Sequence, residues 1–153
     1  MTHSQNAVSL ACQFEGLRLA AYRDGNGIWT IGYGHTAGVK EGDTCTTLQA
    51  NQWLSEDMGV ADAALTRLVH VELNQNQWDA LCDFVFNIGQ GNFAGSSCLA
   101  MLNQGDGAGA IRSICYLGDD EKYHGWIIVA GEASSGLVRR RQAEQALFNQ
   151  EEP

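Results

Sequence analysis

The sequence predicts an α+β fold, with a small glycine-rich β lobe on a larger helical body. Glycine is unevenly distributed: residues 1–42 hold seven of the 18 glycines, residues 43–88 one, and residues 89–136 ten. Glycine weakens a helix interior, so the middle stretch favours uninterrupted helix. Two turn dipeptides, Asp24-Gly25 and Asn26-Gly27, separate two β-prone runs and predict a hairpin. Helices and a hairpin together indicate the α+β class.

The N-terminal region predicts one helix followed by the two strands. Val8, Leu10, Ala11 and Phe14 are spaced to share one helical face, and Gly16 follows as the stop signal. The strands are expected over residues 19–23 and 28–33.

The remainder of the chain predicts helices with recognisable caps. The clearest begins after Asn74, carries apolar residues at i, i+3, i+4 and i+7 between Trp78 and Val85, and ends at Gly89. The other expected helices cover residues 47–58 after Thr46 or Thr47, residues 59–69, residues 98–103 between Ser96 or Ser97 and Gly105, residues 107–117, and a last helix from Ser134 or Ser135 to about residue 149.

Composition excludes several classes of protein. With 153 residues, 44% hydrophobic and 18% charged, the chain is long and apolar enough to bury one core, which excludes intrinsic disorder. Its net charge, 9 − 18 = −9, argues against general nucleic-acid binding and against a polybasic membrane anchor. No apolar run is long enough for a signal peptide or membrane span, so we expect a cytoplasmic product. The five scattered cysteines favour buried free thiols over disulfides or a metal site.

Three residues near the hairpin could carry chemistry. Glu15 follows the first helix, Asp24 lies in the turn and Thr30 is on the returning strand, so all three can converge on one cleft wall. Acetal hydrolysis needs one carboxyl that holds a proton, which the apolar neighbour Phe14 favours for Glu15, and one that stays ionised. The alternative is that both acids have only structural positions, Glu15 as an acid that follows a helix and Asp24 as the cap of its own loop.

Several segments of the chain match the sequence motifs of one known family. They are Glu15-Gly16-Leu17-Arg18, Ala21-Tyr22-Arg23-Asp24, Gly27 to Thr36, Lys40 to Thr44 with Thr46, Leu73-Asn74-Gln75, Phe84 to Gly89, Phe93 to Ser97, Leu102 to Asp106, and Gly136 to Glu144. In these motifs, and in their order along residues 8–148, the chain resembles the phage-type lysozymes, the endolysins of glycoside hydrolase family 24.

The resemblance implies a lysozyme-like fold with a cleft between its lobes. Residues 1–153 would form one catalytic domain, its β lobe at about 15–42 and its helical lobe at about 1–14 and 43–150. Glu15 is implied as the general acid, Asp24 as the general base or electrostatic partner, and Thr30 as the group that positions water. The implied substrate is the β-1,4 bond between N-acetylmuramic acid and N-acetylglucosamine in peptidoglycan. The implied reaction inverts the configuration at the anomeric carbon. It requires only proton transfer and a water molecule, so no metal or organic cofactor is expected.

The resemblance also implies secondary site residues. Thr36, Phe86 and Asn87 are expected to contact the substrate, although the apolar periodicity around Phe86 also fits a helix-core residue. His35 is expected to bind an acidic partner or a backbone carbonyl. One of Arg139, Arg140 and Arg141 should approach Glu15, and this run of three cations is expected to make the field beside the cleft positive.

The resulting hypothesis is a monomeric endolysin muramidase that lyses a phage's host. It would remain in the host cytoplasm until a separately made holin releases it to the cell wall, with no nucleic-acid partner and no stable membrane anchor. Two alternatives remain: a lytic transglycosylase that cleaves the same bond without a water nucleophile, and a wall-binding module without catalysis.

Overall fold

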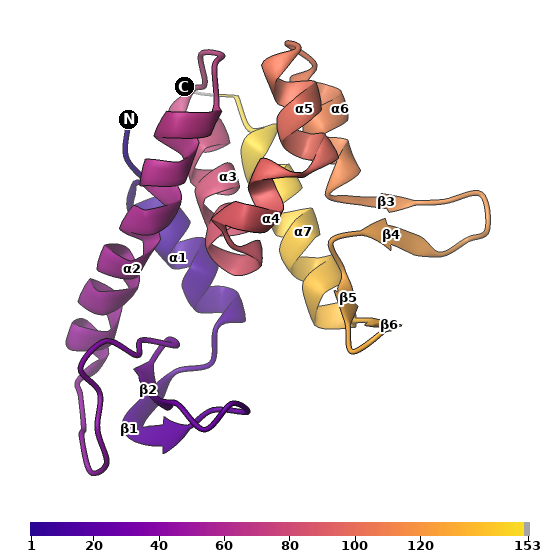
Figure 1. Ribbon diagram of the computed structural model, residues 1–153. Coiled ribbons are helices and arrows are strands. Elements are labelled where there is room, and N and C mark those ends of the chain that lie inside the picture. Colours follow the sequence, from indigo (N-terminus) through magenta and orange to yellow (C-terminus); the bar gives the residue numbers. More distant parts are fainter. Residues whose placement is uncertain (152–153) are drawn as a thin grey trace.

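The structure, a computed structural model that describes residues 1–151, confirms the α+β class (Figure 1). Its helices are α1 (Gln5–Phe14), α2 (Thr47–Leu68), α3 (Gln75–Ile88), α4 (Gln90–Ala94), α5 (Ser97–Asn103), α6 (Gly107–Ser113) and α7 (Ser135–Phe148). Its strands form three separate antiparallel pairs, namely β1 (Arg18–Arg23) with β2 (Trp29–Gly32), β3 (Cys115–Leu117) with β4 (Tyr123–Gly125), and β5 (Ile128–Val129) with β6 (Glu132–Ala133).

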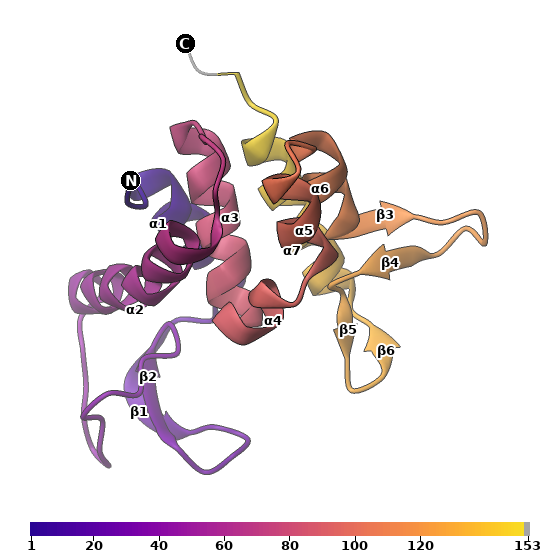
Figure 2. The same ribbon diagram turned by 45° about the horizontal axis from the view of Figure 1, so that its top comes forward.

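Helix α3 is the centre of the helical body, with α1 and α2 on one side and α5, α6 and α7 on the other (Figures 1 and 2). Its N-terminus is closed by a capping box, in which the Asn74 side chain accepts from the Gln77 amide and Gln77 accepts from the Asn74 amide. Gly89 ends it with φ of 85°, a conformation that favours glycine. Every residue from Trp78 to Val85 is buried, so α3 is surrounded by other elements.

The β1–β2 hairpin lies beyond the ends of α1 and α2, away from the helical body (Figure 2). Tyr22 pairs with Thr30 and Arg23 with Trp29 across the turn, which confirms the predicted hairpin. Residues 43–45 run beside β1, since the Cys45 amide donates to the Leu19 carbonyl at 2.9 Å. The hairpin is therefore held by backbone hydrogen bonds to the segment that leads into α2.

The prediction of two helices over residues 47–58 and 59–69 is wrong, because α2 is continuous from Thr47 to Leu68. Gly59 lies in the helix interior. A Cβ atom added there would have no neighbouring atom within 4 Å, apart from the backbone of the helix itself. An interior glycine costs roughly 1 kcal/mol relative to alanine. Burial of Leu54, Met58, Ala61 and Leu65 on one face outweighs that cost.

The prediction of one helix over residues 107–117 is also wrong. The short helix predicted over residues 98–103 is confirmed as α5, whereas α4 and the strands β3 to β6 were not predicted. Helix α6 ends at Ser113, and residues 115–117 form β3, whose Tyr116 pairs with His124 of β4. The turn between β5 and β6 places Ala130 and Gly131 at φ of 50° and 85°, as a tight hairpin turn requires. Strands of two or three residues are stabilised by their partners, so local sequence gives a weak signal for them.

The remaining predicted caps are confirmed. Thr46, Ser96 and Ser134 each accept a backbone amide at the start of a helix, and Ser4, which was not predicted, does the same for α1. All five cysteines are free thiols, of which Cys82, Cys98 and Cys115 are buried. No helix within residues 1–151 is both long enough and apolar enough to cross a membrane.

Candidate active site

Glu15 is the residue that ends α1. Its backbone is extended, with φ of −85° and ψ of 135°, while its amide still donates to the Ala11 carbonyl at 2.9 Å. The change from helix to extended chain turns the side chain out of the helix. That side chain remains 27% exposed, so a ligand can reach the carboxylate.

Asp24 organises the hairpin turn and keeps one oxygen available. Its Oδ1 accepts the amides of Asn26 at 2.8 Å and Ile28 at 2.9 Å. These bonds hold the carboxylate in a fixed orientation. Within residues 1–151, no hydrogen bond reaches Oδ2. The ordinary interpretation, an Asp that caps its own loop, is therefore correct for Oδ1 and leaves Oδ2 for other chemistry.

Thr30 is buried on β2, 3% exposed, and its hydroxyl donates to the Ile28 carbonyl at 3.0 Å. Once that hydrogen is committed, the hydroxyl oxygen has lone pairs left and acts as an acceptor. Both Asp24 and Thr30 bind the same residue, Ile28, so the turn holds the two side chains in a fixed relation.

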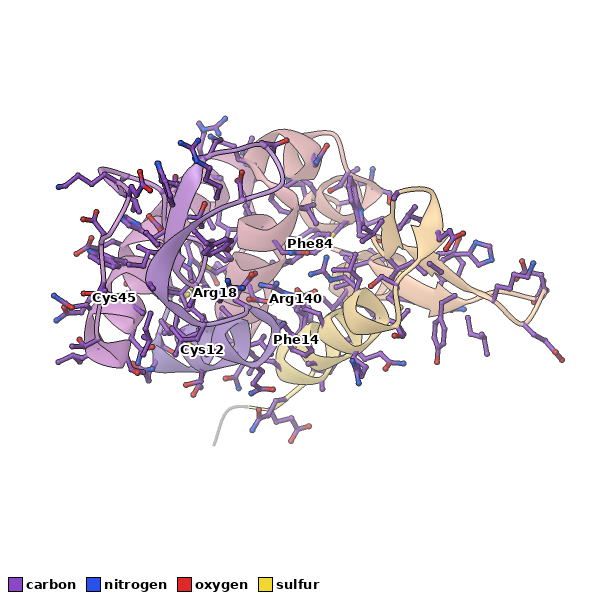
Figure 3. All side chains as sticks on the ribbon, turned by 90° about the horizontal axis from the view of Figure 1, so that it is seen from below. Cys12, Phe14, Arg18, Cys45, Phe84 and Arg140 are labelled. Carbon is purple, nitrogen blue, oxygen red and sulfur yellow. The ribbon has the colours of Figure 1, made fainter. Side chains whose placement is uncertain are left out.

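Arg140 is the arginine that approaches Glu15, which confirms that one of the three does so. Its Nη1 lies 2.6 Å from Oε1 of Glu15, while Nε and Nη2 donate to Asp83 at 2.9 and 2.8 Å. Figure 3 shows Arg140 beside Phe14, whose ring centroid is 5.9 Å from the guanidinium carbon. Burial alone lowers the pKa of Arg140, but the hydrogen bonds and charges of Asp83 and Glu15 outweigh burial and raise it.

The expectation that three exposed cations make the cleft positive is wrong. Arg140 is 3% exposed and Arg141 0%, and both are paired with acids on α7 or α3. Arg141 donates to Glu144 at 2.6 Å and to Asn87 at 2.9 Å. Of the three, Arg139 alone is exposed. The two buried arginines thus contribute little positive potential at the surface.

Glu144 is a buried carboxyl between these arginines. It is 0% exposed, and no hydrogen bond to its Oε2 is found among the described residues. Burial, reinforced by the nearby Asp83 charge, raises the pKa of Glu144 well above its ordinary value. The ion pairs of Glu144 with Arg141 at 2.6 Å and with Arg140 at 3.7 Å act in the opposite direction, toward a lower pKa.

The three expected substrate contacts lie in different surroundings. Asn87 lines a pocket of about 640 Å³ together with Trp126, Val129 and Leu137. Phe86 instead lines a smaller pocket between α2 and α3 and packs on the core. Thr36 is exposed in the turn after β2. The structure thus brings Asn87, but not Phe86 or Thr36, to the pocket beside α7.

Helix α7 contacts both this pocket and Glu15. Leu137, which lines the pocket, precedes Arg140 and Arg141 by about one helical turn and shares their face. Arg140 holds Glu15, and Arg141 holds Asn87. Residues of α7 thus contact both the exposed carboxylate and a mostly apolar pocket, whose size suits a small ligand.

His35 joins the hairpin lobe to α2. Its Nδ1 lies 2.8 Å from the Asp57 carboxylate and its Nε2 lies 3.1 Å from the Ala37 carbonyl, so both kinds of expected partner are present. Its ring also stacks on Trp53, with centroids 4.8 Å apart. These contacts indicate that His35 has a structural role, because they connect the segment after β2 to α2.

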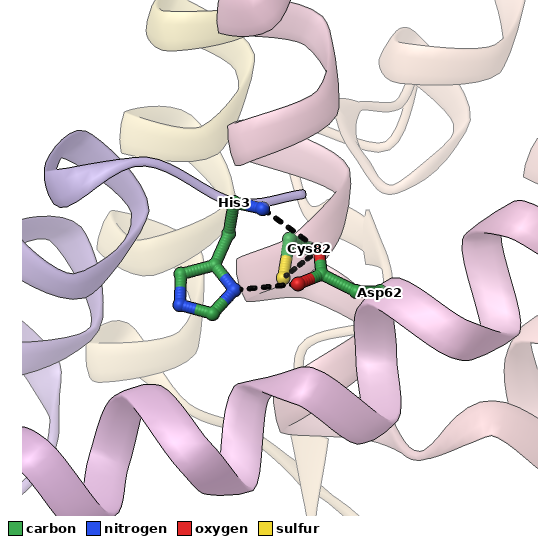
Figure 4. A group of neighbouring side chains, drawn as sticks. All are labelled: His3, Asp62 and Cys82. Carbon is green, nitrogen blue, oxygen red and sulfur yellow. Dashed lines mark hydrogen bonds and ion pairs between the residues drawn. The ribbon is translucent and has the colours of Figure 1, made fainter. Parts of the chain in front are cut away.

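One cluster has the residue types of a metal site, away from Glu15. Ligand atoms of His3, Asp62 and Cys82 lie within 4.8 Å of one another (Figure 4). Asp62 already accepts the His3 ring at 2.7 Å, the His3 amide at 2.9 Å and the Trp78 indole at 2.8 Å. Burial raises the pKa of Cys82, which keeps it a thiol. The cluster fastens the N-terminus to α2 and α3.

Asp83 and Glu144 were not among the residues predicted from sequence. A signal for Asp83 existed, since it interrupts the apolar run from Trp78 to Val85. A charge in such a run is buried and needs a partner. The sequence does not say which arginine provides it.

Comparison with known proteins gives a consistent result. The phage lysozyme family model matches residues 12–144. The endolysin of Acyrthosiphon pisum secondary endosymbiont phage 1 is 42% identical over 149 residues, which cover 95% of this chain and 96% of that protein. The endolysin of Salmonella phage P22 is 39% identical over 153 residues, covering 97% and 98%.

Solved structures of similar proteins share the fold. The muramidase domain of SpmX from Asticaccaulis excentricus superposes with a TM-score of 0.80 at 35% identity, covering 97% of each chain. A mutant of P22 lysozyme gives a TM-score of 0.78 at 38% identity, covering 98% of this chain and 99% of that one.

Proposed function

The chain belongs to the phage lysozyme family, and from that premise we propose that Glu15, Asp24 and Thr30 hydrolyse peptidoglycan. The protein is a glycoside hydrolase, a muramidase of the endolysin type that acts on the cell wall. The bond cleaved is the β-1,4 bond between N-acetylmuramic acid and N-acetylglucosamine. The observation that carries the proposal is the exposed Glu15 carboxylate, fixed by Arg140 at 2.6 Å and joined through α7 to an apolar pocket.

In this proposal Glu15 protonates the leaving glycosidic oxygen. Its exposed carboxyl can reach the sugar, and Arg140 fixes its position. General acid catalysis of this kind typically contributes a factor of roughly 10²–10⁴. When the proton has been transferred, the Glu15 carboxylate that forms is stabilised by the same guanidinium.

Asp24 and Thr30 would orient the attacking water. The free Oδ2 of Asp24 and the Thr30 hydroxyl oxygen are both acceptors, so one water can donate a hydrogen to each. Its lone pair then points away from both and toward the anomeric carbon. Asp24 removes the proton as the bond forms, which leads to inversion at that carbon.

Asn87 is the substrate contact that we propose first, because it lines the pocket beside α7 and its side-chain oxygen is fixed by Arg141. Its amide nitrogen remains a donor for a carbonyl such as that of an N-acetyl group. Phe86 and Thr36 are proposed as weaker contacts at the margins of the site.

The proposal extends to the protein's biological context. We propose a monomer in which residues 1–153 act as one catalytic domain, retained in the host cytoplasm until a holin opens the inner membrane. Expression of the chain alone in a susceptible host tests the last point. Lysis without any holin would contradict it.

The direct test compares wild type with Glu15→Gln for the clearing of bacteria stripped of their outer membrane. Loss of the proton donor should reduce the rate at least 100-fold. Glu41→Gln is the matched control, since it makes the same change at an exposed acid. If Glu15→Gln clears cells as fast as this control, Glu15 is not the general acid.

Product analysis separates the chemistries. Hydrolysis leaves a reducing sugar, whereas a transglycosylase leaves an anhydro sugar lighter by one water. Inversion releases the α-anomer first, which proton NMR of early products detects. A wall-binding module without catalysis would give no product at all.

A further inference from the structure

Asp83 is a fully buried carboxylate for which the proposed reaction has no direct use. It is 0% exposed in the middle of α3, between the buried Cys82 and Phe84. An isolated buried charge is strongly unfavourable unless it is paired. Here the partner is Arg140, which donates from Nε and Nη2 to the two carboxylate oxygens at 2.9 and 2.8 Å.

This bidentate pair determines where the third nitrogen of Arg140 points. A guanidinium is planar and rigid, so fixing Nε and Nη2 also fixes Nη1. Nη1 is the atom that lies 2.6 Å from Glu15. One arginine thus lies between a fully buried carboxylate and the exposed carboxylate of the active site.

The arrangement has an electrostatic consequence. A guanidinium in contact with Glu15 favours the ionised carboxylate, whereas a general acid must hold a proton before it can donate one. Asp83 places a negative charge on the other side of the same guanidinium. The positive field that Glu15 experiences is therefore weaker than that of an arginine without this partner.

We propose that Asp83 is a positioning residue for the reaction: it fixes Arg140 against Glu15 and offsets the guanidinium charge, so that Glu15 can hold the proton it donates. The inference rests on the proposed role of Glu15 as general acid. Asp83 itself touches no substrate.

Other ionisable groups also lie around Asp83 and Arg140. On α7, Glu144 lies 3.7 Å from Nε of Arg140, and burial raises its pKa. Arg141, also on α7, donates to Glu144 and Asn87. On α3, burial raises the pKa of the Cys82 thiol. Asp83 binds Arg140 through two of its nitrogens, so it is the carboxylate that offsets the guanidinium charge from the side opposite Glu15.

The test is Asp83→Asn, which keeps the shape of the side chain and removes its charge. Activity on purified peptidoglycan is measured from pH 4 to 9 at constant ionic strength. A charge separated from Glu15 by one guanidinium should move the alkaline limb of the profile by about one pH unit. The direction is toward lower pH, because the uncompensated guanidinium favours loss of the Glu15 proton.

Asp79→Asn is the matched control. Asp79 is equally buried and lies four residues earlier on α3, but its carboxylate binds the Ser4 amide at 2.8 Å instead of an arginine. This variant should lose stability and leave the alkaline limb within a few tenths of a pH unit of wild type. An equal shift in both variants would overturn the proposal.

A second variant covers the case in which Asp83→Asn does not fold, since a buried arginine that loses its partner destabilises a protein strongly. Asp83→Asn combined with Arg140→Gln removes one negative and one positive charge together. Because Arg140 lies closer to Glu15 than Asp83 does, the alkaline limb of the double variant moves to higher pH. If Asp83 offsets Arg140, this upward shift is smaller than that of Arg140→Gln alone. If Asp83 is only structural, the two variants shift equally.

The outcomes distinguish this inference from the proposed function. If Glu15→Gln remains active, the role of Glu15 fails and the inference fails with it. If Glu15→Gln is inactive and the alkaline limb of folded Asp83→Asn does not move, only the positioning role of Asp83 is wrong.

Discussion

Thr30→Val separates a catalytic hydroxyl from a structural one. Valine has nearly the shape of threonine and suits a strand, so the backbone of β2 should be unchanged. The hydroxyl is 3% exposed and donates to the Ile28 carbonyl at 3.0 Å. If the hydroxyl orients the attacking water, activity should fall while the fold remains.

The expected stability change is small and can be estimated from the contacts. Losing one hydrogen bond costs about 1 kcal/mol, and burying a methyl group in place of the hydroxyl returns about 0.8 kcal/mol. The Ile28 carbonyl does not become unsatisfied, because the Asp24 amide still donates to it at 2.9 Å. A net change within about 1 kcal/mol corresponds to roughly 2–4 °C in Tm for a chain of this size.

The expected loss of activity is larger. Without the hydroxyl, the water keeps one acceptor, Asp24, and a misdirected nucleophile can cost up to roughly 100-fold. Clearing of stripped bacteria and thermal unfolding by circular dichroism are measured on the same preparations. Thr30→Ser is the control, since it keeps the hydroxyl and should retain most activity. A Val variant that clears cells within twofold of wild type would refute the assignment.

Three further predictions concern the rest of the chain. Gly59→Ala should stabilise the protein by up to about 1 kcal/mol in thermal unfolding, because α2 has space at this position; a lower Tm would be inconsistent with that reasoning. With a net charge of −9, lysis should be slower in nearly salt-free buffer than at about 0.1 M salt, where repulsion from an anionic wall is screened. A rate that is greatest without salt would contradict it. At pH 8, Ellman's reagent should label at most two thiols in the folded protein and five after denaturation, because burial raises the pKa of Cys82, Cys98 and Cys115.

Local signals predicted most of the helices and the first hairpin. Asn74, Ser96 and Ser134 begin their helices as the cap residues predict, and the two Asp-Gly and Asn-Gly dipeptides mark the turn. Glycine is a weaker signal of a helix end where the helix packs well on its neighbours. Gly59 predicts a helix boundary, yet the buried face of α2 continues through it. Short strands such as β3 depend on a partner and gave no usable local pattern.

The same contrast holds for the candidate site. Glu15, Asp24 and Thr30 lie within 16 residues of one another, and their turn chemistry is visible in the sequence. The choice of Arg140 among three consecutive arginines depends on which face α7 turns toward α1 and α3. The contribution of Asp83 depends on the same packing. Phe14, which was expected to keep Glu15 in an apolar setting, is accompanied by a guanidinium that contacts the carboxylate directly.

The sequence by itself determined the fold class, the family and the three residues of the proposed chemistry. These follow from short-range patterns, namely helix caps, turn dipeptides and family sequence motifs. Tertiary structure alone decided how the site is charged. Glu15 and Arg140 are 125 residues apart in the chain, and Asp83 and Arg140 are 57 apart. A net charge of −9 cannot show that two of the nine cations are buried and matched to acids. Charge interactions act through space, so only the packing of α7 on α1 and α3 defines them.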